Sequence, residues 1–212
     1  AIREAHVRRR AVAGNVPIAY VNLVGGQDEL VFDGGSIVIA ADGSVVAQSR
    51  MFEEQVLIAD LAVGEARPNA TEPTTVTERS SASITGLPPI IESAPDEMEQ
   101  LWSALVLGTR DYVHNNGFTD ICFGLSGGVD STLVAAIAAE ALGPEHVHAL
   151  LMPSRYSSQH SVSDAEQLSI NLGIDYRTIA IEPAHSAMLE MLAPSFGDLE
   201  PNVTEENVQS RI

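Results

Sequence analysis

The chain of 212 residues has no lysine, a single cysteine and few aromatic residues, which make up 5% of it. Its 11 basic residues are all arginine and stand against 29 aspartates and glutamates, so the formal net charge is −18 at pH 7. A surface this acidic argues against binding nucleic acid or an anionic membrane through general electrostatics. It does not exclude an anionic nucleotide held by backbone N–H groups and Mg²⁺.

The single cysteine and the lack of long apolar runs indicate the compartment. One cysteine excludes an internal disulfide, which favours a reducing environment. No run reaches the length of a membrane span, and the N-terminus shows no signal-peptide pattern. We therefore expect a cytoplasmic protein. Cys122 lies in an apolar run and is expected to be buried as a small hydrophobic residue, not to act as a nucleophile.

The most informative stretch is Ser-Gly-Gly-Val-Asp-Ser at 126–131, which follows an apolar run and precedes apolar residues at helical spacing. Two adjacent glycines let the backbone approach a ligand, because no Cβ is in the way. The N-terminus of a helix then offers free N–H groups and the positive end of a dipole, which suits a phosphate. We therefore expect a strand, a phosphate-binding turn and a helix.

Asp130 in this turn predicts a metal ion. A carboxylate beside phosphates repels them unless a divalent cation bridges the two, so the turn implies Mg²⁺. The simpler alternative is a structural glycine turn with Ser or Asp as an ordinary N-cap. At average composition, the five fixed residues of the motif arise by chance on the order of once per million windows, which favours the phosphate site.

The turn resembles the PP-loop of the N-type ATP pyrophosphatases. It is not a Walker loop, because Gly-Lys-Ser/Thr is missing. By this resemblance the loop grips the β,γ-pyrophosphate of ATP while a substrate attacks the α-phosphorus, so that an adenylate forms and pyrophosphate leaves. The resemblance assigns Mg²⁺ to Asp130, and ATP to eight consecutive residues: Gly124, Leu125, Ser126, Gly127, Gly128, Val129, Asp130 and Ser131.

The segment before the PP-loop has a different pattern. Residues 1–14 are expected to form a helix with arginines on a solvated or subunit-facing surface. Strands are expected at 17–24, 36–40, 45–49 and 55–61, with turns at 25–28 and 41–43.

Residues 19–36 resemble the late part of a nitrilase-type glutaminase domain, in particular that of the glutamine-dependent NAD⁺ synthetases. The match includes Val-Gly-Gly-Gln-Asp-Glu-Leu-Val-Phe-Asp-Gly-Gly at 24–35. In that family a Glu, a Lys and a Cys hydrolyse glutamine, and all three would lie upstream of this segment. We therefore expect Glu29 and Asp33 to have structural roles in a loop.

The second half of the chain alternates helices and strands. After a Pro-, Thr- and Ser-rich linker at 62–94, helices are expected at 95–116, from the PP-loop to about 142, at 161–172 and at 183–192. Strands are expected at 121–125, 146–152 and 175–181. This order predicts a parallel sheet that binds its ligands at the carboxyl ends of the strands.

The loop after the second of these strands begins with Met152. By resemblance it holds the adenine and ribose of ATP, which makes Met152 a second, weaker ATP contact. Arg155 in this loop either approaches phosphate or lies at the surface. His160 is expected to be polar lining and not a catalytic base.

The segment Thr-Glu-Glu-Asn-x-Gln-x-Arg at 204–211 matches the start of a helix in the NAD⁺ synthetases. The resemblance assigns deamido-NAD⁺ to Asn207, with Arg211 close to the same site. A capped acidic helix start explains the segment equally well.

The predicted fold is α/β in two parts. Residues 1–61 are expected to be the C-terminal part of a nitrilase-like α-β-β-α domain, and 62–94 a linker. Residues 95–212 are expected to be the N-terminal part of a parallel-sheet, adenine nucleotide α-hydrolase-like (PP-loop) domain. The chain thus looks like an internal portion of a glutamine-dependent NAD⁺ synthetase.

The resemblance implies a carbon–nitrogen ligase that makes NAD⁺ from deamido-NAD⁺, with ATP, Mg²⁺ and ammonia from glutamine. It also implies a homo-oligomer. No residue of this chain is expected to be a covalent nucleophile. The 212 residues alone are expected to be inactive, because further parts of both sites would lie outside them. Two alternatives stay open: another PP-loop amidotransferase, such as a relative of GMP synthetase, and a non-catalytic nucleotide-binding portion.

Overall fold

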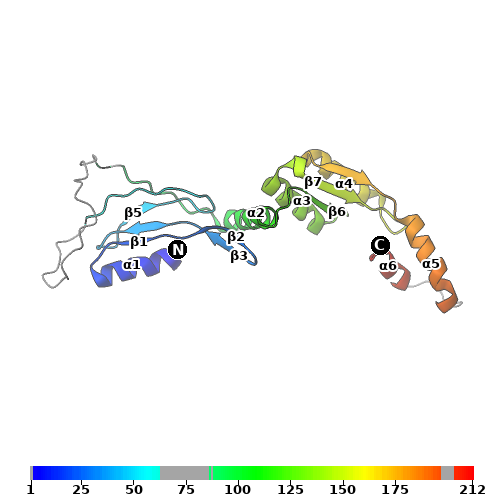
Figure 1. The fold of residues 1–212 in the computed structure, drawn as a ribbon, viewed down its shortest axis with the longest axis horizontal. Coiled ribbons are helices and arrows are strands. Elements are labelled where there is room, and N and C mark those ends of the chain that lie inside the picture. Colours follow the sequence, from blue (N-terminus) through cyan, green and yellow to red (C-terminus); the bar gives the residue numbers. More distant parts are fainter. Residues whose placement is uncertain (1, 63–85, 87, 197–202) are drawn as a thin grey trace. The chain divides into compact units, whose positions relative to one another are not determined.

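The computed structural model describes residues 2–62, 86, 88–196 and 203–212 (Figure 1). Most of the predicted linker at 62–94 therefore lies outside the described residues. The chain divides into two compact units, Ala1–Ala104 and Leu105–Ile212, and the division falls inside helix α2 (Glu97–Asn115). Each unit is described by itself.

The first unit packs one helix on a small antiparallel sheet. Helix α1 (Ile2–Gly14) contacts a sheet of strand order β1-β4-β5, made of β1 (Ile18–Tyr20), β4 (Ile37–Ile39) and β5 (Val45–Gln48). The helix at 1–14 and the hairpin on either side of 41–43 are thus confirmed. The buried side chains between helix and sheet are Val7, Ala11, Ile37 and Ile39.

Three predictions for this unit are wrong. The strand expected at 17–24 is only β1 (Ile18–Tyr20), and Val24 begins a strand of another sheet. The turn expected at 25–28 is mostly strand: β2 (Val24–Gln27) pairs antiparallel with β3 (Leu30–Asp33), and the chain reverses at Asp28 and Glu29. Glycines can occupy a strand as well as a turn, so the Gly-Gly pair misled the assignment. The strand expected at 55–61 is also missing from the described residues, where Val56 and Ile58 are 83% and 56% exposed.

Asp33 has the structural role that the sequence favours. The guanidinium of Arg3 donates to both carboxylate oxygens of Asp33, at 2.6 and 2.8 Å. Asn22 Nδ2 donates to Asp33 Oδ1 at 2.7 Å, and both Arg3 and Asn22 also donate to the carbonyl of Gly34. Asp33 thus ties the end of β3 to α1 and to the chain after β1.

The second unit is built on the predicted parallel sheet. Strands β6 (Ile121–Gly124), β7 (Val147–Leu151) and β8 (Asp175–Thr178) pair in parallel in the order β6-β7-β8. The helices that follow them are α3 (Val129–Leu142), α4 (Gln159–Leu172) and α5 (Glu182–Phe196), with the 3-10 turn η1 (Pro144–His146) before β7. A last helix, α6 (Val203–Gln209), contacts α5.

The buried face of α3 consists of alanines. Its buried residues are Ala135, Ala138, Ala139 and Ala141. By contrast Val129, Leu133 and Val134, which carry the helical spacing in the sequence, are 83%, 48% and 49% exposed. Small side chains allow α3 to lie close to β7 and α4, and this close packing decides which face is buried.

Cys122 is exposed, contrary to the sequence-based expectation. Alternate residues of a strand point to opposite faces of the sheet. Ile121 and Phe123 of β6 pack on the core formed with α3 and α4, so Cys122 belongs to the opposite face, together with its neighbour in the register, His148. The apolar run correctly predicted that Cys122 lies in a strand, but not that its side chain lies on the exposed face of the sheet.

Helix α2 begins and ends within two residues of the prediction, but two residues of the apolar side that the sequence indicates, Leu101 and Tyr112, are not buried. Leu107 and Val113 are buried, while Leu101 and Tyr112 are 56% and 59% exposed. Within the described residues, no helix is long and apolar enough to span a membrane.

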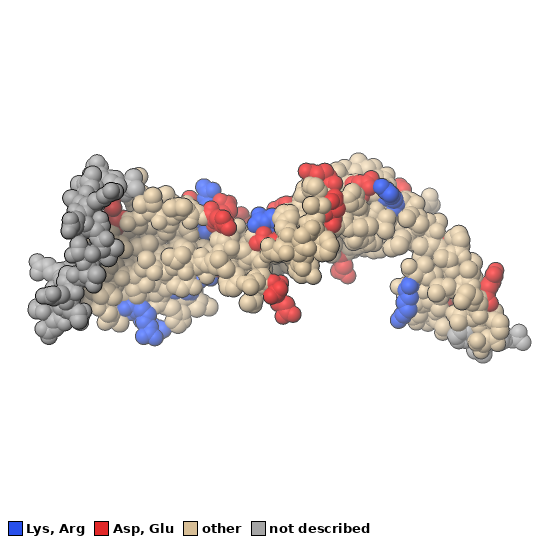
Figure 2. All heavy atoms as spheres, viewed as in Figure 1, with Lys and Arg blue, Asp and Glu red and all other residues tan. Residues whose placement is uncertain are grey.

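Acidic side chains gather around η1 and the start of β7 on the face shown in Figure 2. Here His148 lies between two carboxylates: its Nδ1 is 3.2 Å from Asp175 Oδ2 and its Nε2 is 3.3 Å from Asp120 Oδ1. His146 also contacts Asp120, and Arg177 lies 3.7 Å from Asp175. Hydrogen bonds raise the pKa of His148 above its ordinary value. The bond with Asp175 contributes most and the bond with Asp120 comes next.

This cluster predicts that His148 makes stability depend on pH. Folding favours protonated His148, so its stabilisation is complete below the ordinary pKa and is lost as pH rises through the raised one. We expect His148→Gln to lower the melting temperature at about pH 5.5 and to have little effect at about pH 9. Thermal unfolding at both pH values measures this, with His160→Gln on the exposed start of α4 as the control. An equal loss at both pH values would contradict it.

Candidate functional site

The predicted phosphate turn joins β6 to α3, as the sequence indicates. Gly128 is the N-cap of α3, in extended conformation and without a capping side chain. Ser131 Oγ donates to the Gly128 carbonyl at 3.1 Å, and the backbone N–H of Ser126 points to Ser131 Oγ at 3.3 Å. The two serine hydroxyls are 3.1 Å apart. These contacts hold 126–131 as a tight turn at the carboxyl end of a parallel strand.

Gly127 brings this turn against helix α4. Its φ is +78°, in the left-handed region that favours glycine. A Cβ at this position would lie 2.1 Å from the carbonyl oxygen of Ser161 and 2.9 Å from its carbon. Both the backbone conformation and the close approach therefore require glycine here.

Asp130 lies in the first turn of α3 and is exposed. The described residues contain no group of three or more His, Cys, Asp or Glu side chains that could hold a metal ion by themselves. Mg²⁺ commonly uses one or two carboxylates together with substrate phosphates and water. One exposed carboxylate next to the predicted phosphate turn fits such a shared site, so Asp130 is suited to hold Mg²⁺ only with a nucleotide present.

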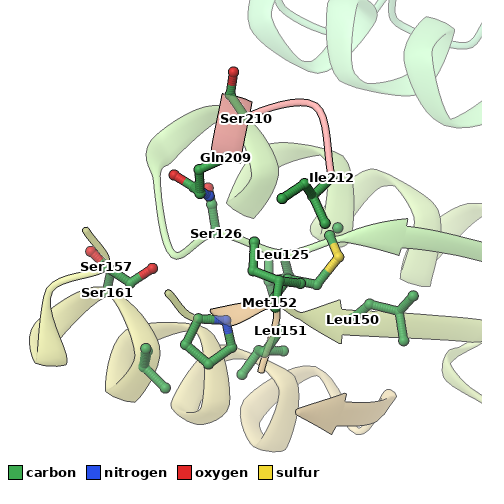
Figure 3. Close-up of a pocket in the computed structure, with 14 residues that line it drawn as sticks. Leu125, Ser126, Leu150, Leu151, Met152, Ser157, Ser161, Gln209, Ser210 and Ile212 are labelled. Atoms are coloured by element: carbon green, nitrogen blue, oxygen red, sulfur yellow. The ribbon is translucent and has the colours of Figure 1, made fainter. Parts of the chain in front are cut away.

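A cavity of about 270 Å³ opens beside the turn (Figure 3). Its apolar wall comes from the ends of β6 and β7 and from the segments that follow them. Hydroxyl and amide groups come from Ser126, Ser157, Ser161, Gln209 and Ser210. Figure 3 shows Met152 extending toward Ile212 across the cavity, with Gln209 on the same side as Ser126. The predicted contacts Gly124, Leu125, Ser126 and Met152 line this cavity together.

The substrate residues expected near the C-terminal end lie beside the cavity, not in its lining. Asn207 is exposed, and its carbonyl accepts a 2.7 Å hydrogen bond from Arg211 Nη1. Their neighbours Gln209, Ser210 and Ile212 form the wall. Gln209 belongs to the same motif, but no role was predicted for it. Residues two apart on a helix face different sides, so the motif gave no sign that Gln209 and not Asn207 lines the cavity.

Arg155 is paired with Glu182 at the start of α5. Arg155 Nε donates to Glu182 Oε1 at 2.9 Å, its backbone N–H donates to Oε2 at 3.1 Å, and Nη2 also contacts Oε1. These contacts with Arg155 lower the pKa of Glu182 to about 2. Of the two roles the sequence left open for Arg155, the structure shows a surface ion pair that fixes the loop after β7.

His160 was expected to be polar lining, but it does not line the cavity. His160 lies exposed on the first turn of α4, one residue before Ser161. Ser158 caps this helix by accepting the backbone N–H of Ser161 at 3.0 Å. Ser157 and Ser161 line the cavity, but the sequence did not predict this role for them. Both lie in the serine-rich run at 154–163, which marked a loop and a helix start but not which hydroxyls face inward.

Two family models match the chain. The model for carbon-nitrogen hydrolase matches residues 2–70, and the model for NAD synthase matches residues 101–212. The chain is 42% identical to a Thermotoga maritima protein and 44% identical to a Synechocystis protein, both named glutamine-dependent NAD(+) synthetase. The matches take in the whole chain but only 39% and 35% of these relatives.

A solved structure gives the same relationship. A glutamine-dependent NAD⁺ synthetase from Acinetobacter baumannii, in complex with adenosine diphosphate, matches 99% of this chain with 36% identity and a TM-score of 0.77, over 36% of its own length. The chain therefore spans well under half the length of the relatives it matches. Since the NAD synthase model covers more than half of its residues, including the turn and the cavity, the chain belongs to the NAD synthase family.

Proposed function

We propose that this chain forms the ATP-binding part of an enzyme that amidates deamido-NAD⁺ to NAD⁺ through an adenylate intermediate. The observation that carries the proposal is the glycine turn at 126–128, which lies at the carboxyl end of β6 beside a cavity lined by the start of the Met152 loop and the end of α6. Family membership supports the choice of substrates.

The residues of the turn would hold the pyrophosphate of ATP. Gly127 and Gly128 leave the backbone accessible, and the N-terminus of α3 adds the positive end of its dipole. This arrangement suits a chain with a formal charge of −18, because it binds an anion without basic side chains. The hydroxyls of Ser126 and Ser131 lie at the same turn and would complete the donor set.

Mg²⁺, held by Asp130 and the phosphates, would neutralise charge on the leaving pyrophosphate. The apolar wall beside Met152 suits the adenine ring, with the hydroxyls of Ser157 and Ser161 near the ribose. The α-phosphorus would then face the end of α6, where Asn207 and Arg211 are proposed to position deamido-NAD⁺. Catalysis here is positional and electrostatic.

The nitrogen would come from glutamine. Similarity of residues 2–70 to carbon-nitrogen hydrolases supports a glutaminase in the full-length protein, from which ammonia would displace AMP. The expectations of a homo-oligomer and of a cytoplasmic location stay predictions.

Asp130→Asn in the full-length natural protein tests the assignment of Mg²⁺. We expect AMP and NAD⁺ formation from deamido-NAD⁺ and Mg-ATP to fall about 100-fold or more with either glutamine or ammonia, because the metal loses its carboxylate. Asp164→Asn on the exposed side of α4 is the control. Normal rates for Asp130→Asn would contradict the metal site. Pyrophosphate release with another acceptor, and none with deamido-NAD⁺, would place the enzyme in a different PP-loop class.

Gly127→Ala tests the close approach of the turn to α4. The methyl group must move either the turn or the Ser161 carbonyl, so we expect AMP formation to fall about 100-fold. Gly117→Ala is a matched control, because Gly117 has the same φ of +78° with nothing within 4 Å of an added Cβ. That variant should lose about 1 kcal/mol of stability from backbone strain and keep its rate. Equal effects of the two substitutions on rate would show that the contact with α4 is unimportant.

The 212 residues expressed alone are predicted to make no NAD⁺, since they span only 35–39% of their relatives. Incubation with deamido-NAD⁺, Mg-ATP and ammonia measures this. NAD⁺ formation above a protein-free blank would disprove it.

A further inference from the structure

His185 is fully buried in α5, yet one of its ring nitrogens has no hydrogen-bond partner among the residues that the structure describes. Nε2 lies 3.0 Å from the backbone carbonyl oxygen of Glu205 in α6. A carbonyl only accepts, so Nε2 carries a hydrogen and donates it to Glu205. Within the described residues, Nδ1 makes no hydrogen bond although it is buried. Burying an unpaired polar atom is costly, so an apolar side chain would fill this position better if packing were its only role.

The same imidazole contacts the loop after β7. The ring of Tyr156 packs against it edge to face, with centroids 5.7 Å apart and an interplanar angle of 77°. The neighbouring Arg155 is fixed to the same end of α5 through Glu182, and its Nη2 lies 3.4 Å from Ser186 Oγ. The first two turns of α5 thus hold the loop on one side and α6 on the other.

Helix α6 is short and lies at the surface of the described part of the second unit. It is seven residues long and none of its residues is buried, so apolar packing contributes little to its position. Its end nevertheless supplies Gln209 and Ser210 to the cavity wall. A hydrogen bond from a buried, conformationally restricted imidazole would fix the first turn of α6 and, through the helix, the residues at its end.

We propose that His185 is a positioning residue that sets the affinity for deamido-NAD⁺ by holding α6, and with it Asn207 and Gln209, against the ATP-side loop. This inference rests on the proposed function for the identity of the substrate. The hydrogen bond to the Glu205 carbonyl is the feature that histidine adds over an apolar residue. His185 itself does not line the cavity and takes no part in the chemistry.

The test compares His185→Leu with His185→Gln in the full-length natural protein, with ammonia as nitrogen donor. Leucine fills the space but cannot donate, while the glutamine amide can replace Nε2–H. We expect His185→Leu to raise KM for deamido-NAD⁺ about tenfold, as for the loss of one hydrogen bond, with kcat changed less than about twofold. His185→Gln should restore KM to within about threefold of the parent.

Two further variants keep the test decisive. Ser169→Ala removes another buried hydrogen bond, from Ser169 Oγ to the Ala165 carbonyl at 2.8 Å, within α4 and away from α6; it should leave KM unchanged. If His185→Leu does not fold, His185→Asn takes its place in the test. The asparagine amide is too short to reach the carbonyl of Glu205, so this variant is also non-donating. An unchanged KM in the non-donating variant, or equal KM values for it and His185→Gln, would overturn the inference.

Hydrogen exchange separates this inference from the proposed function. Backbone amides at 203–212 should exchange faster in His185→Leu than in His185→Gln, whatever reaction the protein catalyses. If the parent protein makes no NAD⁺ but this difference is present, the proposed substrate is wrong and the positioning role stands. If NAD⁺ is made and exchange at 203–212 is the same in both variants, the positioning role is wrong.

Discussion

The close approach of Gly127 to the Ser161 carbonyl is the constraint on which the candidate site depends. It places the turn after β6 directly against the first turns of α4, so two segments that follow neighbouring strands meet at one edge of the sheet. Residues of both segments, Ser126 of the turn and Ser161 of α4, line the cavity. A side chain at position 127 would push the turn and Ser161 apart, although Ser126 and Ser161 now line the same cavity.

The acidic composition agrees with a cavity whose described lining contains no basic side chain. The one arginine in the loop beside the cavity, Arg155, is engaged by Glu182, whose pKa is lowered to about 2 so that it stays ionised at any physiological pH. An ion pair this exposed adds little to stability. Its effect is geometric: it joins the loop after β7 to the start of α5.

The sequence predicted the order of elements in the second unit and the position of the phosphate turn, because each strand and helix there carries a strong local signal. It failed where tertiary contacts choose between two local options. The spacing of Val129 and Leu133 indicated an apolar face on α3, but close packing on β7 selected the alanine face. The Gly-Gly pair at 25–26 is compatible with either strand or turn, and pairing with Val31 and Phe32 decided for strand.

The same distinction explains which site residues could be found. A motif such as Ser-Gly-Gly-x-Asp-Ser can be recognised in a sequence because all of its residues lie in one short segment. His185 is not, since its role depends on Glu205 and Tyr156, which lie 20 residues after it and 29 residues before it along the chain and meet it only in the fold. Buried polar side chains that join separate segments carry no local pattern. They become recognisable as functional candidates only when the structure shows an incomplete set of hydrogen bonds, because no packing argument explains why that residue is polar.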